Sequence, residues 1–294
     1  MHLTEQDILK RVRQIEIKTR GLSDEIFAGK YHSAFRGRGM SFAEVREYRV
    51  GDDVRDIDWN VTARSERTHV KVFEEERELT MMLVVDVSPS RMFGSKELTK
   101  KNVITEIAAT LAFSAAKNND KVGCILFSDK VEKFIPPKKG RAHVMMIIRE
   151  LVGFEPQGTS TNISEALRYL VGVNKKRTTS FLLSDLIDSE ADLSKLDDAL
   201  KIASSKHDLM AIRVYDERDG ELPNVGIMEL KDAETGRSEW VDTSSRRVRE
   251  YWKSEYERRN AHIDSMLRQN RVDIANVATD GDYVAELLKM FKQR

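Results

Sequence analysis

Short oxygen-bearing side chains stand directly after apolar segments of this sequence, at spacings that suit metal chemistry. Asp86, Ser88 and Ser90 follow the run MMLVV, and Asp185 follows the run FLL, with the polar stretch GTSTN between them. Carboxylate and hydroxyl oxygens without His or Cys suit Mg²⁺, or another hard cation such as Mn²⁺ or Ca²⁺. The sequence therefore predicts one metal ion, with these candidate ligands: Asp86, Asp185, Ser88, Ser90, Thr159 and Thr161.

The same hydroxyls also have a structural interpretation. Ser88 and Ser90 could cap a following helix, with Pro89 shaping a turn, and Thr161 could be an N-cap followed by Glu165. Each hydroxyl taken singly leaves both interpretations open. The full set, spread over three predicted strand ends, favours the metal.

The hydrophobic pattern around these residues alternates between strands and helices. Strands are predicted at 81–87, 121–128, 130–136, 179–185, 208–216 and 271–279, with a short strand around Val70 and Val72 and a hairpin within 220–243. Helices are predicted around 104–115, 141–152, 163–173, 192–204, 248–267 and 284–291, and at the N-terminus a helix with Ile8, Val12 and Ile15 on one face. This order predicts an α/β fold with a doubly wound, mostly parallel sheet. In such sheets ligands bind at the carboxyl ends of the strands, where the candidate ligands stand.

Composition narrows the classes of function. The 294 residues include 49 Lys and Arg against 49 Asp and Glu, so the net charge is zero, and 40% are hydrophobic. The hydrophobic fraction is enough for a core, and the charge balance argues against a non-specific nucleic-acid binder. The single cysteine, Cys124, excludes an intrachain disulfide and a multi-thiolate metal site, and we expect it to be buried.

No apolar run approaches the ~20 residues of a membrane-spanning helix, and the first residues lack the apolar core of a signal peptide. We therefore expect a cytoplasmic protein without direct membrane insertion, whose membrane association, if any, comes through partners.

Several enzyme classes lack their motifs. An aspartyl phosphatase needs a second carboxylate where Ser88 stands, and GxxxxGK[ST], HExxH and a strand-linked GxGxxG are absent. A metal-dependent phosphoesterase or nuclease that uses Asp86, Asp185 and the acidic Asp56–Asp58 remains the alternative.

The segment before the first long strand differs in character from the rest. Acidic and basic residues alternate almost residue by residue between 36 and 78, and we expect a charged N-terminal part, 1–79, before an α/β domain, 80–294. Its arginines and carboxylates could pair among themselves. Alternatively, the segment is a docking face with Tyr48 and Trp59 as anchors, since aromatic residues and Arg dominate interface energetics.

Two resemblances follow from these residues. The DVSPS, TNISEAL and LLSD segments resemble the metal-ion-dependent adhesion site of von Willebrand factor A domains over roughly 80–294. The upstream motif is similar to the signature of the bacterial domain-of-unknown-function family fifty-eight, and from it we select as partner-binding candidates Arg46, Tyr48, Asp52, Arg55, Asp58, Trp59 and Arg64.

The resemblance implies a role for each metal candidate. Asp86, Ser88 and Ser90 match the first motif, and Thr161 is preferred to Thr159 because TNISEAL matches best. Asp185 matches the last acidic position, without the glycine that often follows it. The family implies a metal whose open position takes a partner's carboxylate.

The implied partners are a MoxR-type AAA+ ATPase and other von Willebrand A-like proteins. The implied role is an adaptor in chaperone-like assembly or maturation, and no catalytic activity is established for the family as a class. We therefore expect a non-enzymatic, metal-dependent protein-interaction module.

Overall fold

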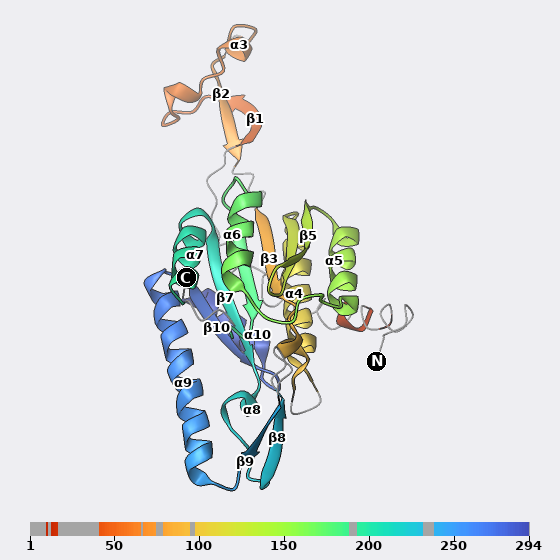
Figure 1. The fold of residues 1–294 in the computed structure, drawn as a ribbon. Coiled ribbons are helices and arrows are strands. Elements are labelled where there is room, and N and C mark those ends of the chain that lie inside the picture. Colours follow the sequence, from red (N-terminus) through yellow and green to blue (C-terminus); the bar gives the residue numbers. More distant parts are fainter. Residues whose placement is uncertain are drawn as a thin grey trace. The chain divides into compact units, whose positions relative to one another are not determined.

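The structure is a computed structural model that describes residues 10, 13–16, 41–65, 67–74, 79–94, 98–187, 193–231 and 238–293 (Figure 1). The chain divides into two compact units. Phe35–Leu79 form a small unit, and Met1–Ala34 with Thr80–Arg294 form the main unit. The predicted division into 1–79 and 80–294 stays a prediction, and most of the helix predicted at the N-terminus lies outside the described residues.

A six-stranded sheet forms the centre of the main unit, in the order β10-β7-β6-β3-β4-β5. Its strands are β3 (Thr80–Asp86), β4 (Lys121–Phe127), β5 (Val131–Lys138), β6 (Thr179–Ser184), β7 (Asp208–Tyr215) and β10 (Asp273–Ala278). Only β5 is antiparallel to its neighbour. The central strands are buried on both faces, because helices cover both, and this explains their continuous apolar runs.

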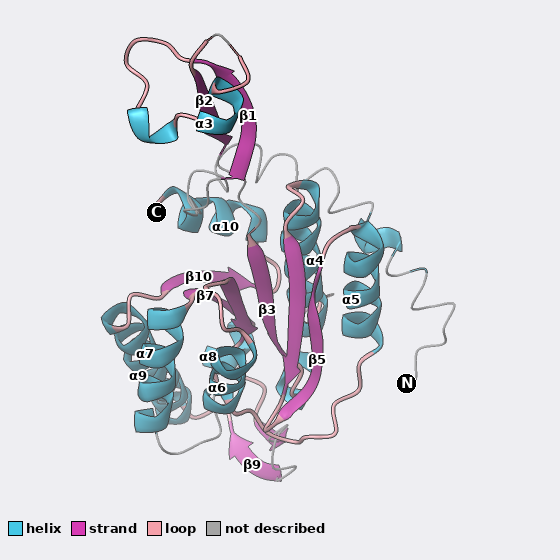
Figure 2. Ribbon diagram, turned by 90° about the horizontal axis from the view of Figure 1, so that it is seen from above, coloured by secondary structure: helices cyan, strands magenta, loops and turns pink. Residues whose placement is uncertain are grey.

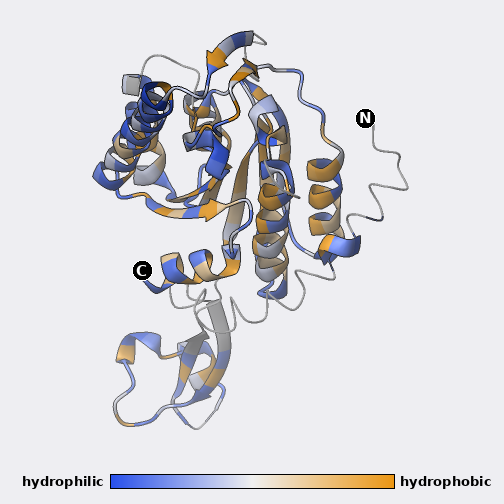
Figure 3. Cartoon of the chain, turned by 90° about the horizontal axis from the view of Figure 1, so that it is seen from below, coloured by the Kyte–Doolittle hydropathy of each residue, from blue (hydrophilic) through white to orange (hydrophobic). Residues whose placement is uncertain are grey.

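Helices cover the sheet in two layers (Figure 2). One layer holds α6 (Ile163–Val173), α7 (Leu193–Lys206) and α9 (Arg246–Gln269), and the other holds α4 (Lys100–Lys117), α5 (Arg141–Gly153) and α10 (Tyr283–Lys292). Met82 and Val84 of β3 share a core cluster with residues of α6, α7 and α9. On the other face, Phe181 of β6 packs edge-on against Phe291 of α10. Hydrophobic residues are concentrated on the strands and on α5 (Figure 3).

The predicted α/β fold with a doubly wound, mostly parallel sheet is confirmed. The predicted strands and helices occur at their expected places, with ends that differ by a few residues. The excursion after β7 contains the short helix α8 (Glu217–Gly220) and the predicted hairpin, β8 (Ile227–Lys231) with β9 (Ser238–Asp242). Cys124 is fully buried, as expected, and burial raises the pKa of its thiol.

The small unit is a two-stranded antiparallel sheet with short helical turns. It contains β1 (Ser41–Glu47), the 3-10 turn η1 (Val54–Asp56), α3 (Trp59–Thr62) and β2 (His69–Glu74). The sequence pattern indicated β2 but not β1. Ile57 and Val70 are buried against each other across an isolated bridge, so a few apolar contacts hold this charged segment together.

Candidate metal centre

Asp86 and Asp185 lie side by side because their strands are parallel neighbours. Asp86 ends β3 and Asp185 directly follows β6, with Val85 opposite Leu183 in the register. The Oδ1 atom of Asp86 accepts from the Ser88 amide at 2.8 Å, and its Oδ2 accepts from the Ser184 hydroxyl at 2.6 Å. Both carboxylates are at least nine-tenths buried.

The two carboxylates repel each other in this position. Burial, and then the charge of Asp185, raise the pKa of Asp86 to about 6. Hydrogen bonds from Ser184 and Ser88 offset only part of this effect. A hard cation between the carboxylates would remove the repulsion, so the donors fit the ion that the sequence predicts.

The serine hydroxyls do not act as helix caps. Ser88 is in the N-cap position of the 3-10 turn η2 (Pro89–Met92), but its side chain makes no capping hydrogen bond. The hydroxyls of Ser88 and Ser90 instead lie 2.9 Å apart. The capping interpretation of Ser88 is therefore wrong.

Thr161 is not a cap either. Asn162 caps α6, because its side chain accepts from the Glu165 amide at 2.9 Å. Thr161 is fully buried and Thr159 is exposed, which favours Thr161 over Thr159 as the candidate hydroxyl ligand of a metal.

The loop that carries Thr161 is fastened to the end of β4, the strand beside β3. The Asn162 amide donates to the carbonyl of Ser128 at 2.8 Å. Glu132 Oε1 accepts from the Ser128 hydroxyl at 2.7 Å and from the amides of Gln157 and Gly158 at 2.9 and 2.7 Å. These contacts bring Thr161 to the same edge of the sheet as the acidic pair. Glu132 escaped the sequence analysis, because it lies on a half-exposed edge strand.

A Cβ atom has no room at Gly158. It would lie 1.9 Å from Asp129 Oδ1 and 2.2 Å from the Ser128 hydroxyl, which explains the glycine in this loop.

Lys100 is a second residue that sequence reasoning missed. Its Nζ atom lies 3.1 Å from Asp185 Oδ2 and 2.8 Å from Asp219 Oδ2, and its side chain is almost fully buried. Burial alone would lower the pKa of Lys100, but Asp185 and Asp219 outweigh burial and raise it. Its helical spacing was the sequence feature that could have identified it as buried, since Lys100 shares the apolar face of α4 with Ile104 and Leu111.

Arg91 is a third missed residue. Its guanidinium is buried and donates to the carbonyl of Phe154 at 2.7 Å, which joins η2 to the start of the loop that carries Thr161. Burial lowers the pKa of Arg91 to about 10, although the charge of Asp86 opposes this change.

The partner-binding candidates are spread over the small unit, and some of them pair internally. Arg46 forms a two-pronged ion pair with Asp52, at 2.7 and 2.8 Å. Hydrogen bonds from Arg46, and then from the Arg49 amide, lower the pKa of Asp52 to about 2. Asp58 caps α3 through the amides of its second and third residues. The self-pairing interpretation therefore describes Arg46 and Asp52.

The remaining candidates are accessible. Trp59 is 69% exposed, Tyr48 is partly exposed, and Arg55 and Arg64 are exposed. Val50 and Val54 are exposed beside them in sequence, and charge-based reasoning did not select them. The small unit thus presents aromatic and aliphatic side chains together with arginines.

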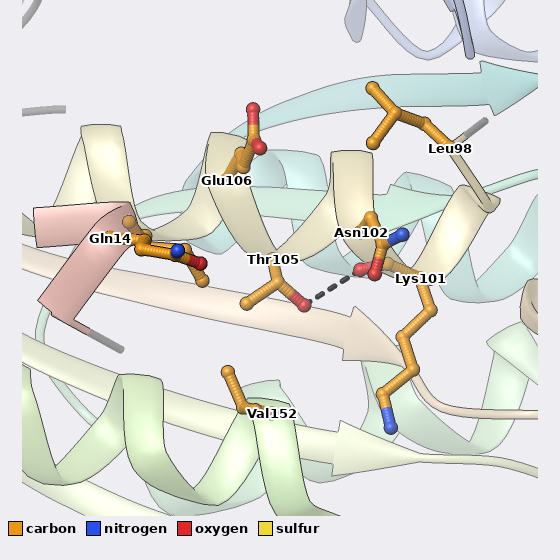
Figure 4. Close-up of a pocket in the computed structure, with 8 residues that line it drawn as sticks. Gln14, Leu98, Lys101, Asn102, Thr105, Glu106 and Val152 are labelled. Carbon is orange, nitrogen blue, oxygen red and sulfur yellow. Dashed lines mark hydrogen bonds between the residues drawn. The ribbon is translucent and has the colours of Figure 1, made fainter. Parts of the chain in front are cut away.

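A separate pocket of about 300 Å³ lies between α4, α5 and the short helical segment 13–16 (Figure 4). It is lined by Gln14, Ile15, Leu98, Lys101, Asn102, Thr105, Glu106 and Val152. Thr105 donates back to the Lys101 carbonyl, so its hydroxyl is hydrogen-bonded within α4. The pocket shares no lining residue with the candidate metal centre.

Within the part of the chain that the structure describes, no helix has both the length and the apolar character that crossing a membrane requires. Among the described residues, no three His, Cys, Asp or Glu side chains form a group that could hold a metal ion.

Known proteins resemble this chain at different levels. An uncharacterized protein of Mycobacterium tuberculosis (strain ATCC 25618 / H37Rv), Rv1480, is 27% identical over 287 residues, which cover 96% of this chain and 88% of the relative. An uncharacterized protein of Mycobacterium avium, MAV169, is 25% identical over 162 residues, 54% of this chain and 93% of the relative.

Solved structures with a similar arrangement include a conserved hypothetical protein, BatB, from Bacteroides thetaiotaomicron, with a TM-score of 0.47 and 14% identity over 73% of this chain and 98% of that one. An aerotolerance-related membrane protein from Bacteroides fragilis NCTC 9343 has a TM-score of 0.48 and 16% identity, over 73% of this chain and 97% of that one.

The sequence profile of one family, described as a protein of unknown function, DUF58, matches residues 44–262. The match spans both the signature of the small unit and most of the sheet of the main unit. The chain belongs to the DUF58 family.

Proposed function

We propose that this chain is a non-enzymatic, metal-dependent protein-interaction module and a partner of a MoxR-type AAA+ ATPase. Its role is that of an adaptor in chaperone-like assembly or maturation, in the cytoplasm, with any membrane attachment supplied by partners. The metal is one Mg²⁺, or Mn²⁺ or Ca²⁺, bound by Asp86, Ser88, Ser90, Thr161 and Asp185.

One observation carries the proposal: two buried, mutually repelling carboxylates stand beside hydroxyls that cap no helix. Burial and Asp185 raise the pKa of Asp86, so the fold bears an electrostatic cost there. A cation bound between the two carboxylates would offset this unfavourable energy. The serine hydroxyls supply further neutral oxygens.

Neighbouring groups orient both carboxylates of the proposed metal site. Asp86 is oriented by the Ser88 amide and the Ser184 hydroxyl, so its remaining lone pairs have fixed directions. Asp185 is oriented by the Ile187 amide at 3.1 Å. An ion held by these residues would attract a carboxylate oxygen of the partner, and the binding energy would then depend on the ion.

The chemistry of the centre supports binding more than turnover. Ser88 stands where a phosphatase of the aspartyl type needs its general acid, and a serine hydroxyl cannot transfer a proton in this way near neutral pH. Among the described residues, Lys100 is held by Asp185 and Asp219, which keeps its ammonium charged and unsuited to act as a base.

The test is capture of the MoxR-type ATPase by the full chain, with Mg²⁺ or with chelator. We expect wild type to capture the ATPase with Mg²⁺. Capture should fall at least about tenfold with chelator or with Asp86→Ala, because removing a residue that only orients a metal ligand already costs about 10–100-fold in metal affinity. Asp198→Ala, at an exposed position of α7, is the matched control and should behave as wild type.

Equal capture by wild type and Asp86→Ala, with or without chelator, would contradict the metal-bridge proposal. Turnover of a phosphoester or nucleic acid that requires Mg²⁺ and is lost in both Asp86→Ala and Asp185→Ala would establish the enzymatic alternative instead.

A further inference from the structure

The ammonium group of Lys100 occupies an unusual position for a lysine. Lys100 is the first residue of α4, after the N-cap Thr99, so it lies at the positive end of the helix dipole. It is also 2% exposed. Burial and the dipole both disfavour a cation there, and the partners that offset this are Asp185 and Asp219, with the ring of Phe93 at 5.8 Å.

Asp219 is held firmly by its surroundings. Its Oδ2 accepts from the Asp216 amide at 2.8 Å in a capping box, and its carbonyl accepts from Trp252 Nε1 at 3.0 Å. The next residue, Gly220, is packed so closely that a Cβ would lie 2.6 Å from the Tyr256 ring. Helices α8 and α9 therefore fix the carboxylate that shares the ammonium with Asp185.

Asp185 belongs both to the ion pairs of Lys100 and to the candidate metal centre. Lys100 contacts Asp185 Oδ2, while Asp185 Oδ1 accepts the Ile187 amide, so both oxygens of Asp185 are engaged. A divalent ion bound by Asp185 would share the negative charge of this carboxylate with the ammonium of Lys100, and the two cations would repel each other.

We propose that Lys100 sets the cation affinity of the candidate metal centre by competing for Asp185, and that Asp219 limits this competition by holding part of the ammonium. This inference rests on the proposed function, because it concerns the same metal. Lys100 and Asp219 are positioning residues that act through Asp185. By linkage, metal binding shifts the ammonium toward Asp219 and alters the surroundings of Trp252.

Two substitutions should change Mg²⁺ affinity in opposite directions. Lys100→Met keeps an unbranched side chain, one atom shorter, and removes the charge, so the dissociation constant for Mg²⁺ should fall at least about tenfold. Asp219→Asn removes a carboxylate and leaves the ammonium to Asp185, so the constant should rise at least about tenfold. Lys101→Met, one residue away on a different side of α4, is the matched control and should leave it unchanged.

Calorimetric titration of the full chain with MgCl₂ measures these constants. A second readout is the fluorescence of Trp252 in a Trp59→Phe, Trp240→Phe background, which should change on Mg²⁺ addition in wild type and less in Asp219→Asn. A residue with only a packing role would weaken binding in both variants, so the opposite signs separate the two roles.

The outcomes are distinguishable. Absence of Mg²⁺ binding by wild type would overturn the proposed function and this inference together. Binding by wild type, with the same or weaker affinity in Lys100→Met, would overturn this inference alone. If Lys100→Met does not fold, Asp219→Asn decides, because affinity equal to or tighter than that of wild type would overturn the inference.

Discussion

The carboxylate of Asp86 is unfavourable in the fold unless a cation compensates it. Burial and the charge of Asp185 raise its pKa from the usual 3.8 of an aspartate to about 6. A rise of this size corresponds to roughly 3 kcal/mol of preference for the neutral form. Ionisation of Asp86 therefore lowers the free energy of unfolding of the metal-free protein, and this loss develops as the pH rises from about 4 through about 6.

Asp86→Asn should relieve this cost. In the presence of chelator, the variant should unfold at a higher temperature than wild type above about pH 6, and the difference should disappear well below it. Thermal unfolding on both sides of this pH measures the effect. Added Mg²⁺ should stabilise wild type and not Asp86→Asn.

A metal-free Asp86→Asn variant that is less stable than wild type at neutral pH would show that the hydrogen bonds of Asp86 outweigh its repulsion by Asp185. Asp282→Asn, at the exposed N-cap of α10, is a control in which the same change has no buried neighbour to relieve.

In the small unit, the ion pair between Arg46 and Asp52 gives a second prediction. The folded pKa of Asp52, about 2, lies below the usual 3.8 of an aspartate, so its contribution to stability is present above about pH 4 and is lost as the pH falls toward 2. Arg46→Met should raise the pKa of Asp52 toward 3.8, because it removes the main cause of the shift. Carboxyl NMR titration measures this directly, and an unchanged pKa would exclude the pair in solution.

Among the elements, the loop between α5 and α6 determines where Thr161 lies. Glu132 accepts two amides of this loop and the hydroxyl of Ser128, so one edge-strand side chain fastens the loop to the sheet. The sequence GTSTN predicted a polar turn here but gave no indication of this partner, which lies 25 residues from Gln157.

Glu132→Ala should free the loop and weaken Mg²⁺ binding about 10–100-fold, with the fold retained. The reason is that three hydrogen bonds to one carboxylate oxygen are lost together. Calorimetry with MgCl₂ measures the change, and Glu165→Ala, exposed on the first turn of α6, is the control. Unchanged Mg²⁺ affinity in Glu132→Ala would show that the loop does not contribute a ligand.

Local sequence predicted the elements of the main unit well, because buried parallel strands and amphipathic helices have strong hydrophobic patterns. It failed for β1, whose sequence mixes charged and apolar residues without a clear period and which pairs with β2. It left a capping role for Thr161 open, whereas the neighbouring Asn162 caps α6.

For the whole molecule, the exposed Trp59 allows a test of the docking face. Trp59→Ser should weaken capture of the MoxR-type ATPase about thirtyfold, as expected for an interface hot spot, and should leave Mg²⁺ binding and the unfolding temperature unchanged. Trp240→Ser is a matched control, because Trp240 on β9 is also 69% exposed. Equal losses in both variants would point to a non-specific effect of removing an exposed tryptophan.

The sequence by itself determined the fold class and the family signature, and it predicted the residues of the candidate metal centre, because these depend on local patterns and on motif spacing. The tertiary structure decided what surrounds them. Lys100 and Asp219 are 119 positions apart, and only the packing of α4 against the carboxyl edge of the sheet brings both to Asp185. Charge repulsion and ion pairing depend on distance in space, which no local pattern encodes.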